Sequence, residues 1–456
     1  MTARVAVLVL AGCASDPKGG DTSTADDPLA FGTYDQRTGD PDAGLHTLLY
    51  GDYVGSGIPA AVWFDIVGEV DDGIGRTGDN GKVPIAFNVF DTPNGVEVVG
   101  GVTCFGCHSG ELEGERVLGL GNWQTDQTHD ESGRYALLAD MVADRYGADS
   151  PEVEASWRVT TGSSVAGPHQ VMPFAGPNPA FALEQAVASV RDPVTLDYLD
   201  TPTFEPPPLP GADVPALWLL KRKRALYWTG LGEGDHARLL SQTAIVGIFD
   251  VDALDAVDAG FPDVLAWIYS LEAPAWPGDV DTALAADGEA LFAHHCADCH
   301  GTYGPDGAWT NRVVPLDTVG TDPIYAEALQ ADSPLVQWLS ASWWASGDTP
   351  GVFAPKPGYI APPLDGVWAT APYFHNGSVP DLVGVLDSSE RPAAWKAEDD
   401  SMVDRDRVGR RWTTAEPGGI DVFDTSVSGY GNGGHTFGDG LAASEREALL
   451  EYLKTL

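Results

Sequence analysis

The sequence predicts a mainly α-helical chain with long irregular loops, few short strands and two domains of similar construction. The pattern Cys-x-x-Cys-His occurs twice, at residues 104–108 and 296–300. An amphipathic helical segment closes each half of the chain, at residues 262–274 and 444–456. The 54 glycines and 34 prolines among 456 residues indicate extensive loops but stay below the level typical of disorder.

The N-terminus is typical of an exported protein. Arg4 precedes a short apolar run, and the sequence LAGC ends that run at Cys13. LAGC resembles a bacterial lipoprotein cleavage box, so we expect a signal peptide at residues 1–12, a lipid on Cys13 and a flexible tether over residues 13–45. An ordinary signal peptide or a truncated start is the alternative. We therefore expect a periplasmic or outer-membrane-anchored bacterial lipoprotein without a transmembrane helix.

The two Cys-x-x-Cys-His motifs predict two covalently bound haem c groups. Two thiols at this spacing match the vinyl groups of a haem, and the histidine that follows reaches the iron. A redox dithiol or a zinc site uses the same cysteine spacing, but neither needs a histidine directly after the second cysteine. Apart from Cys13, the motifs use every cysteine, so none remains for a structural disulfide. The predicted thioether and axial residues are Cys104, Cys107 and His108 in the first motif, and Cys296, Cys299 and His300 in the second.

The segments around the motifs suggest how the chain is divided. A helical pattern over residues 281–295 leads into the second motif, whereas the β-branched sequence VEVVGGVTC before the first motif argues against a leading helix. The sequence RYALLADMVADRYG predicts a helix that ends at Gly147, and Ser444 with Glu447 forms a potential capping box for the last helix. The sequence APAWPGD is typical of a linker. We therefore predict an N-terminal haem domain over residues 46–278 and a C-terminal one over residues 279–456.

Several stretches resemble one protein family. They include LLYGDYVGSGIP, GGVTCFGCHSG, PPLDGVWATAPYFHNGSVPDL and the ending FDTSVSGYGNGGHTFGDGL. Together they are similar to the di-haem cytochrome c peroxidase superfamily, which also contains the enzyme that matures methylamine dehydrogenase, and most of all to its rubber-oxygenase-like branch. The resemblance runs from about residue 46 to the end. It implies two cytochrome c-like domains. Peroxide or dioxygen would react at the N-terminal haem, whose iron His108 binds, and the C-terminal haem would relay electrons.

The resemblance also implies roles for residues outside the two motifs. His435 in GGHTFG matches the distal ligand of the C-terminal haem, with Met402 as the alternative. Tyr373 and His375 belong to the surroundings of that haem, where His375 is expected to bond a propionate or a carbonyl. His129 matches a switchable ligand of the first iron, or else it is an exposed loop histidine, and His169 is a weaker candidate. An open first site would have an aromatic pocket with candidates Phe174, Phe181, Trp218 and Trp228. A calcium ion between the domains is a further expectation.

Charge and length restrict the function further. The net charge of −42 and the pI near 4.2 oppose binding to nucleic acids or anionic lipids and favour a basic partner, such as a small cytochrome, although solubility alone also explains them. The chain is much shorter than the rubber oxygenases and carries a lipoprotein signal, which argues against rubber as the substrate. The alternatives to a peroxidase or oxygenase are a membrane-tethered electron-transfer cytochrome without a catalytic site, and a haem-based sensor or maturation partner.

Overall fold

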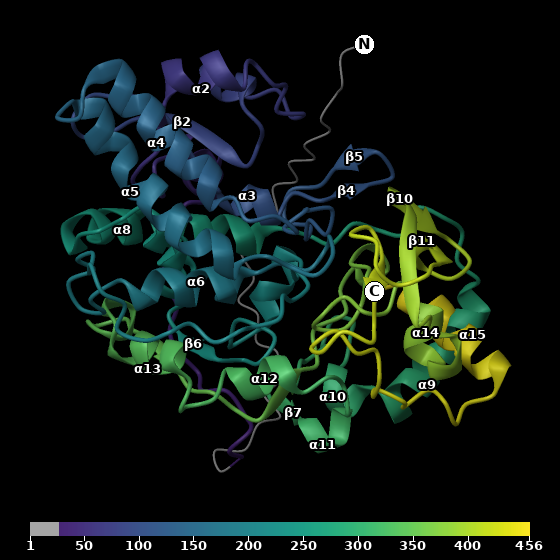
Figure 1. Ribbon diagram of the computed structural model, residues 1–456. Helices are drawn as coiled ribbons and strands as arrows, with labels where there is room; N and C mark the ends of the chain where they lie inside the picture. The colour runs from purple at the N-terminus through teal and green to yellow at the C-terminus, as the bar shows by residue number, and fades with distance from the viewer. Residues whose placement is uncertain (1–26) are drawn as a thin grey trace.

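The computed structural model describes residues 27–456, apart from the side chain of Asp400. The predicted signal peptide and Cys13 lie outside the described residues. Figure 1 shows a lobe of blue and teal helices beside a second lobe that ends in the yellow C-terminal segment. Helices make up 39% of the chain and most strands are short, which confirms the mainly α class.

The first motif lies at the end of a small sheet in the N-terminal lobe. Strands β1 (Ile58–Pro59), β3 (Glu97–Gly101) and β2 (Phe87–Asp91) pair antiparallel in that order, and β3 leads into the motif as its β-branched residues predict. Helix α4 ends at Tyr146, with Gly147 following, also as predicted. The helices of this lobe are α1 (Pro41–Tyr50), α2 (Ala60–Ile66), α3 (Cys104–Cys107), α4 (Ser132–Tyr146), α5 (Pro151–Ala166), α6 (Ala180–Ser189), α7 (His236–Leu240) and α8 (Val251–Ser270).

Two crossing helices frame the second motif. Helix α9 (Thr282–His295) leads into α10 (Ala297–His300) and packs across α15 (Ala443–Leu453). They approach most closely at Gly288, where a Cβ would lie 1.9 Å from the carbonyl oxygen of Ala448. The predicted Ser444/Glu447 capping box is wrong by two residues: α15 begins at Ala443, and the Glu445 carboxylate accepts from the backbone N–H of Ala442 at 2.7 Å.

Residues beyond the predicted linker also pack against the N-terminal lobe. Helix α13 (Pro334–Ala341) contacts α6, and β8 (Gly351–Phe353) pairs with β6 (Gly232–Gly234). In Figure 1, α13 lies below α6 in the first lobe. The domain boundary at residue 278 therefore stays a prediction, because elements on both sides of it pack together. The remaining elements are β4 (Glu111–Leu112), β5 (Glu115–Arg116), β7 (Val313–Pro315), α11 (Leu316–Val319), α12 (Ile324–Ala328), β9 (Gly358–Ile360), α14 (Leu382–Leu386), β10 (Ala394–Asp404), β11 (Gly409–Thr414) and β12 (Phe423–Asp424).

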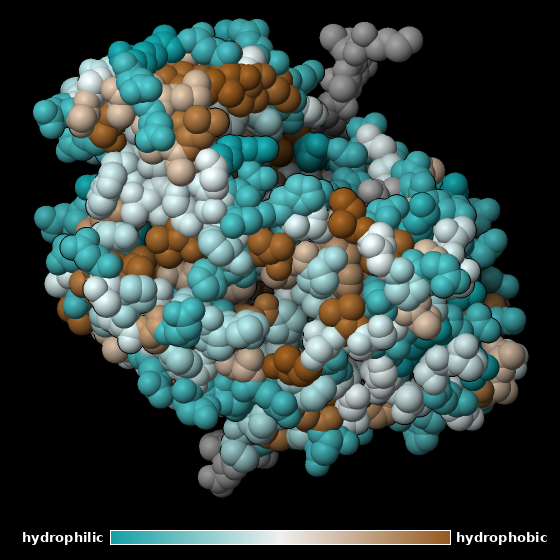
Figure 2. Space-filling view, viewed as in Figure 1, coloured by the Kyte–Doolittle hydropathy of each residue, from teal (hydrophilic) through white to brown (hydrophobic). Residues whose placement is uncertain are grey.

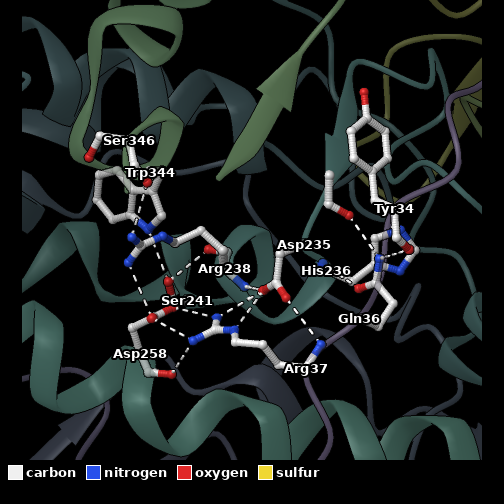
Figure 3. A network of polar contacts seen from close by, with 11 residues as sticks. Tyr34, Gln36, Arg37, Asp235, His236, Arg238, Ser241, Asp258, Trp344 and Ser346 are labelled. Carbon is white, nitrogen blue, oxygen red and sulfur yellow. Dashed lines mark hydrogen bonds and ion pairs between the residues drawn. The ribbon is translucent and has the colours of Figure 1, made fainter. Parts of the chain in front are cut away.

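Residues 27–40 form a packed strap, which corrects the expectation of a flexible tether up to residue 45. Phe31 is 3% exposed and bonds through its N–H to the carbonyl of Asn311 in the C-terminal half. At the other end, Arg37 forms ion pairs with Asp235 at 2.8 Å and with Asp258 at 2.7 Å (Figure 3). One buried aromatic residue and one doubly paired cation thus order a segment whose polar composition suggested disorder.

One face of the molecule is mostly hydrophilic (Figure 2), in agreement with the strong negative charge. Figure 2 shows hydrophilic residues over most of one face, with apolar side chains gathered at the top, in the region of α2 and α4. Exposed apolar residues on these helices include Ile66, Leu137 and Met141. Within residues 27–456, the helices are too short or too polar to cross a bilayer.

Candidate haem sites

The second motif presents two thiols and an oriented imidazole to a cavity. Cys296 and Cys299 are free thiols. The ring of His300 pairs Nδ1 with the carbonyl oxygen of Pro362 at 2.9 Å, which leaves Nε2 for a metal. Burial lowers the pKa of His300, so the ring is neutral at neutral pH, and only a neutral imidazole ligates a metal. These residues fit a covalently bound haem with His300 as an axial ligand.

His435 faces His300 across this cavity. The two ring centroids lie 6.2 Å apart, with their planes at 68°. Imidazoles on opposite sides of one metal ion have centroids roughly 6 to 6.5 Å apart, since each metal–nitrogen bond measures ~2.0–2.1 Å. Burial, the neighbouring His300 and the charge of Arg391 lower the pKa of His435 to about 4. The separation and the charge state of the pair therefore suit two axial ligands of one iron.

The cavity between these histidines is apolar and large. It encloses about 1440 Å³ of empty space, including its open mouth. The residues around it include both cysteines, and apolar side chains from both lobes cover its walls: Leu219, Trp228, Phe292, Val314, Ile360, Leu382, Leu386, Phe437 and Leu453.

The APYFHNGS segment borders the same cavity. The ring of His375 stacks on Tyr359, with centroids 3.9 Å apart, and its Nε2 is buried without a hydrogen-bond partner. Burial lowers the pKa of His375 to about 3. Tyr373 is buried and donates its hydroxyl to the carbonyl of Val367 at 3.0 Å. The unpartnered Nε2 is suited to a haem propionate, the role expected of His375.

The first motif is embedded in the N-terminal core. Cys104 and Cys107 are free thiols, and the side-chain amide of Asn178 donates to Cys107 Sγ at 3.1 Å. Burial lowers the pKa of His108 to about 4, and the nearby Pro215 carbonyl partly opposes that shift. His108 Nδ1 is buried without a hydrogen bond of normal geometry. A neutral histidine beside two free thiols has the residue types of a haem c attachment motif.

A repeated backbone segment, here called the cradle, supports both motif histidines. Equivalent residues lie 147 positions apart in the sequence. In each copy a proline carbonyl faces the motif histidine. Eleven residues after that proline, an isolated antiparallel β-bridge begins, and it closes a turn in which two residues have positive φ. An aspartate then caps the next helix, Asp235 in the first copy and, one position earlier relative to the turn, Asp381 in the second. The matching pairs are Pro215 and Pro362, Leu226 and Tyr373, Tyr227 and Phe374 (φ +68° and +71°), and Gly230 and Gly377 (φ +67° and +72°).

The two cradles meet at Asp213. Trp228 and His375 occupy equivalent positions, and Trp228 Nε1 donates to the Asp213 carbonyl at 2.7 Å. The backbone N–H of Asp213 donates to the His375 carbonyl at 2.8 Å. Burial raises the pKa of Asp213 well above its ordinary range, and Arg410 opposes that shift. One residue thus connects the supports of both candidate haem sites.

A buried polar group on α6, the helix that begins two residues after Asn178, was not predicted from the sequence. Glu184 on α6 is 8% exposed, and one carboxylate oxygen has no hydrogen-bond partner. Burial raises its pKa to about 8. Tyr227 lies within its electrostatic reach and donates its hydroxyl to Gln242, and the next residue, Thr243, hydrogen-bonds to Cys104. The signal in the sequence is a single glutamate within the apolar helix NPAFALEQAVASV.

The other predicted residues lie apart from the irons. His129 is exposed on a loop, where Nδ1 contacts the hydroxyl of Thr128 at 2.9 Å. Met402 lies on β10 and is not among the residues that surround the cavity at His300. Of the four aromatic candidates, Phe181 packs on Tyr227 at 4.7 Å, Trp228 borders the C-terminal cavity, and Phe174 and Trp218 belong to other core clusters. Within residues 27–456, His, Cys, Asp and Glu side chains form no group of three or more suited to a metal ion.

Comparison with known proteins supports haem c binding in the C-terminal half. A family model described as RoxA-like, cytochrome c-like matches residues 358–396, which contain most of the second cradle and Arg391. A cytochrome c-like domain carries covalently bound haem c, so the match supports this cofactor and, in general, a haem-containing oxidoreductase.

Two curated relatives and one solved structure show more distant similarity. The uncharacterised proteins y4iJ and y4iM of Sinorhizobium fredii (strain NBRC 101917 / NGR234) are 31% and 33% identical over 252 and 210 residues. Each alignment covers 41% of this chain, and the chain spans 41% and 46% of those relatives. Hydrazine synthase of Kuenenia stuttgartiensis aligns at 17% identity and a TM-score of 0.25, over 54% of this chain and 72% of its own.

Proposed function

We propose that this chain is an exported di-haem c-type oxidoreductase in which peroxide or dioxygen reacts at the N-terminal haem and the C-terminal haem relays electrons. When bound, each haem would supply a redox-active iron able to react with an oxidant. The observation that carries the proposal is the 6.2 Å separation of His300 and His435, which suits a saturated iron in the C-terminal half only.

The residues near the first motif support reaction chemistry there. Glu184 stays protonated up to about pH 8 because of burial, so it holds a proton beside Tyr227 at neutral pH. Groups whose pKa lies near the working pH are the effective proton donors and acceptors. The apolar and aromatic residues of the same core exclude bulk water from this proton. We assign Glu184 the acid–base role at the N-terminal site.

The residues between the two sites support electron relay. Asp213, Trp228 and His375 join the two cradles through hydrogen bonds of 2.7 and 2.8 Å. Short bonded connections of this kind keep the two supports at a fixed separation. The net charge of −42 suits a basic electron donor, such as a small cytochrome, and a lipid on Cys13 would anchor the protein at the periplasmic or outer-membrane surface.

Low-temperature EPR of the oxidised, haem-loaded protein tests the proposal. We expect two haems per chain, with one low-spin signal from the C-terminal haem and one high-spin signal from the N-terminal haem. A low-spin first haem that becomes high-spin after half-reduction would instead identify a peroxidase with a switchable ligand. Two low-spin signals that persist after half-reduction would contradict the proposal and leave an electron-transfer cytochrome.

A further inference from the structure

The loop that carries His435 is held by the guanidinium group of Arg391. Nη1 donates to the carbonyl oxygens of Asn432 at 2.8 Å and of Gly434 at 2.7 Å, and Nη2 donates to the carbonyl of His435 itself at 3.0 Å. Nε donates to the carbonyl of Gly384 in α14 at 2.7 Å. One planar cation therefore ties the 432–435 loop to the helix that follows the second cradle.

The 432–435 loop has a conformation that needs such support. His435 has a φ of +43°, in the left-handed region that residues with a Cβ rarely adopt. Gly434 has a φ of +72°, and a Cβ there would lie 2.0 Å from the carbonyl carbon of Gly320. The backbone N–H of His435 donates to the Val319 carbonyl at 2.6 Å. Arg391 satisfies carbonyl groups on the other side of the same turn, so the two contacts fix the direction of the imidazole.

Arg391 also contacts an aromatic neighbour of His435. Its guanidinium carbon lies 5.0 Å from the centroid of the Phe374 ring, and that ring lies 5.7 Å from the ring of His435. Phe374 belongs to the cradle whose proline carbonyl orients His300. The residues that direct the two imidazoles are thus in contact with each other.

We infer that Arg391 is a positioning residue that keeps His435 facing His300 and thereby decides whether both axial positions of the C-terminal haem are filled. This inference rests on the proposed function, which assigns His435 as the ligand. Without the guanidinium group, three loop carbonyls lose their donor and the left-handed turn at His435 loses one of its two supports. The imidazole then leaves the position that an iron ligand requires.

The test compares Arg391→Ala and Arg391→Gln in the full haem-loaded chain, with spin state measured by EPR and absorption spectroscopy. We expect the equilibrium at the C-terminal haem to shift towards high spin by at least about tenfold in both variants, since bonds from a charged donor are the strong ones. Added guanidinium should restore the low-spin form of Arg391→Ala. Arg446→Ala is the matched control: Arg446 donates to the carbonyls of Gly438 and Leu441, further along the same segment, and should leave the spin state unchanged.

The possible outcomes separate this inference from the proposed function. If His435→Ala becomes high-spin while both Arg391 variants stay low-spin, the inference is overturned and the ligand assignment stands. If His435→Ala stays low-spin, the assignment of His435 fails, and the inference fails with it. If Arg391→Ala does not fold or load haem, Arg391→Gln decides by the same criterion. A high-spin Arg391→Ala that guanidinium does not restore would indicate general loss of structure and would also overturn the inference.

Discussion

The two motif regions share a backbone support but differ in what faces it. At the C-terminal motif, a second neutral imidazole lies 6.2 Å from His300 across a large apolar cavity. At the N-terminal motif, the neighbouring buried groups are a carboxyl, a phenol and an amide, from Glu184, Tyr227 and Gln242. The first arrangement suits a saturated metal, and the second suits proton transfer.

The difference shows which elements of the fold give each half its own chemistry. The cradle supplies the proline carbonyl and the turn in both halves, whereas His435 comes from the 432–435 loop and Glu184 from α6, both outside the repeated segment. Within the repeat most side chains differ, and Trp228 stands at the position equivalent to His375. The chemistry of each half therefore depends on the elements placed around a common frame.

Removal of His435 should have the largest effect on this comparison. In His435→Ala, the C-terminal haem loses one axial ligand, and its EPR signal should change from low-spin to high-spin, while the signal of the N-terminal haem stays the same. Met402→Leu is the control, since Met402 lies on β10 away from the cavity. The opposite result, with a change only in Met402→Leu, would make Met402 the ligand.

Replacing the ionisable carboxyl of Glu184 tests the N-terminal half in the same way. We expect Glu184→Gln to slow the reaction with peroxide by roughly 10²- to 10⁴-fold, the usual contribution of a positioned acid–base group. Stopped-flow absorption measures the rate. Glu205→Gln, which changes an exposed glutamate of the same lobe, should keep the wild-type rate. Equal rates for both variants and the wild type would remove Glu184 from the chemistry.

The raised pKa of Glu184 also predicts how stability depends on pH. Its pKa is about 8 in the folded chain against an ordinary value of 4.5, so between these values the folded state binds one more proton than the unfolded state. The free energy of unfolding therefore falls as pH rises through this range, by up to about 1.4 kcal/mol per pH unit. Thermal unfolding from pH 4 to 9 should show Glu184→Gln gaining stability relative to wild type up to about pH 8. Parallel curves would contradict this.

The sequence predicted the parts that depend on local pattern. The motif spacing, the strand before the first motif and the end of α4 at Gly147 follow from residue types at short range. The expected tether was wrong beyond residue 26 because two side chains, Phe31 and Arg37, anchor it to residues about 200 positions away. Such contacts leave no periodic pattern.

The repeated cradle was not visible in the sequence for a different reason. Its copies share backbone conformation more than side chains: Tyr227 and Phe374 both have a φ near +70°, although neither residue type favours it. Only the proline, a leucine two residues after it and the glycine of the turn are common to both copies at the same spacing. The lone glutamate of α6 was the one legible signal of the N-terminal polar group.

The two cradle glycines allow a matched comparison of stability. Gly230→Ala and Gly377→Ala both place a Cβ at positive φ, which costs about 1–2 kcal/mol. At Gly230 the new Cβ would also lie 2.4 Å from Phe31, whereas at Gly377 the nearest atom is 3.2 Å away on Pro372. Urea unfolding should show an additional loss of about 1–3 kcal/mol for Gly230→Ala because the strap must shift. Equal losses would show that the strap does not constrain the first cradle.

The smallest effect is expected for His129, and it decides between two kinds of first haem. A switchable ligand must approach the iron opposite His108, but His129 is exposed and contacts its neighbour Thr128. His129→Ala should therefore leave both the EPR spectrum and the peroxide rate of the oxidised and half-reduced protein unchanged. A first haem that is low-spin in the oxidised wild type and high-spin in His129→Ala would identify a ligand that moves by rearrangement of the loop. The N-terminal site would then be closed until the C-terminal haem is reduced, and the contrast between the halves would depend on redox state.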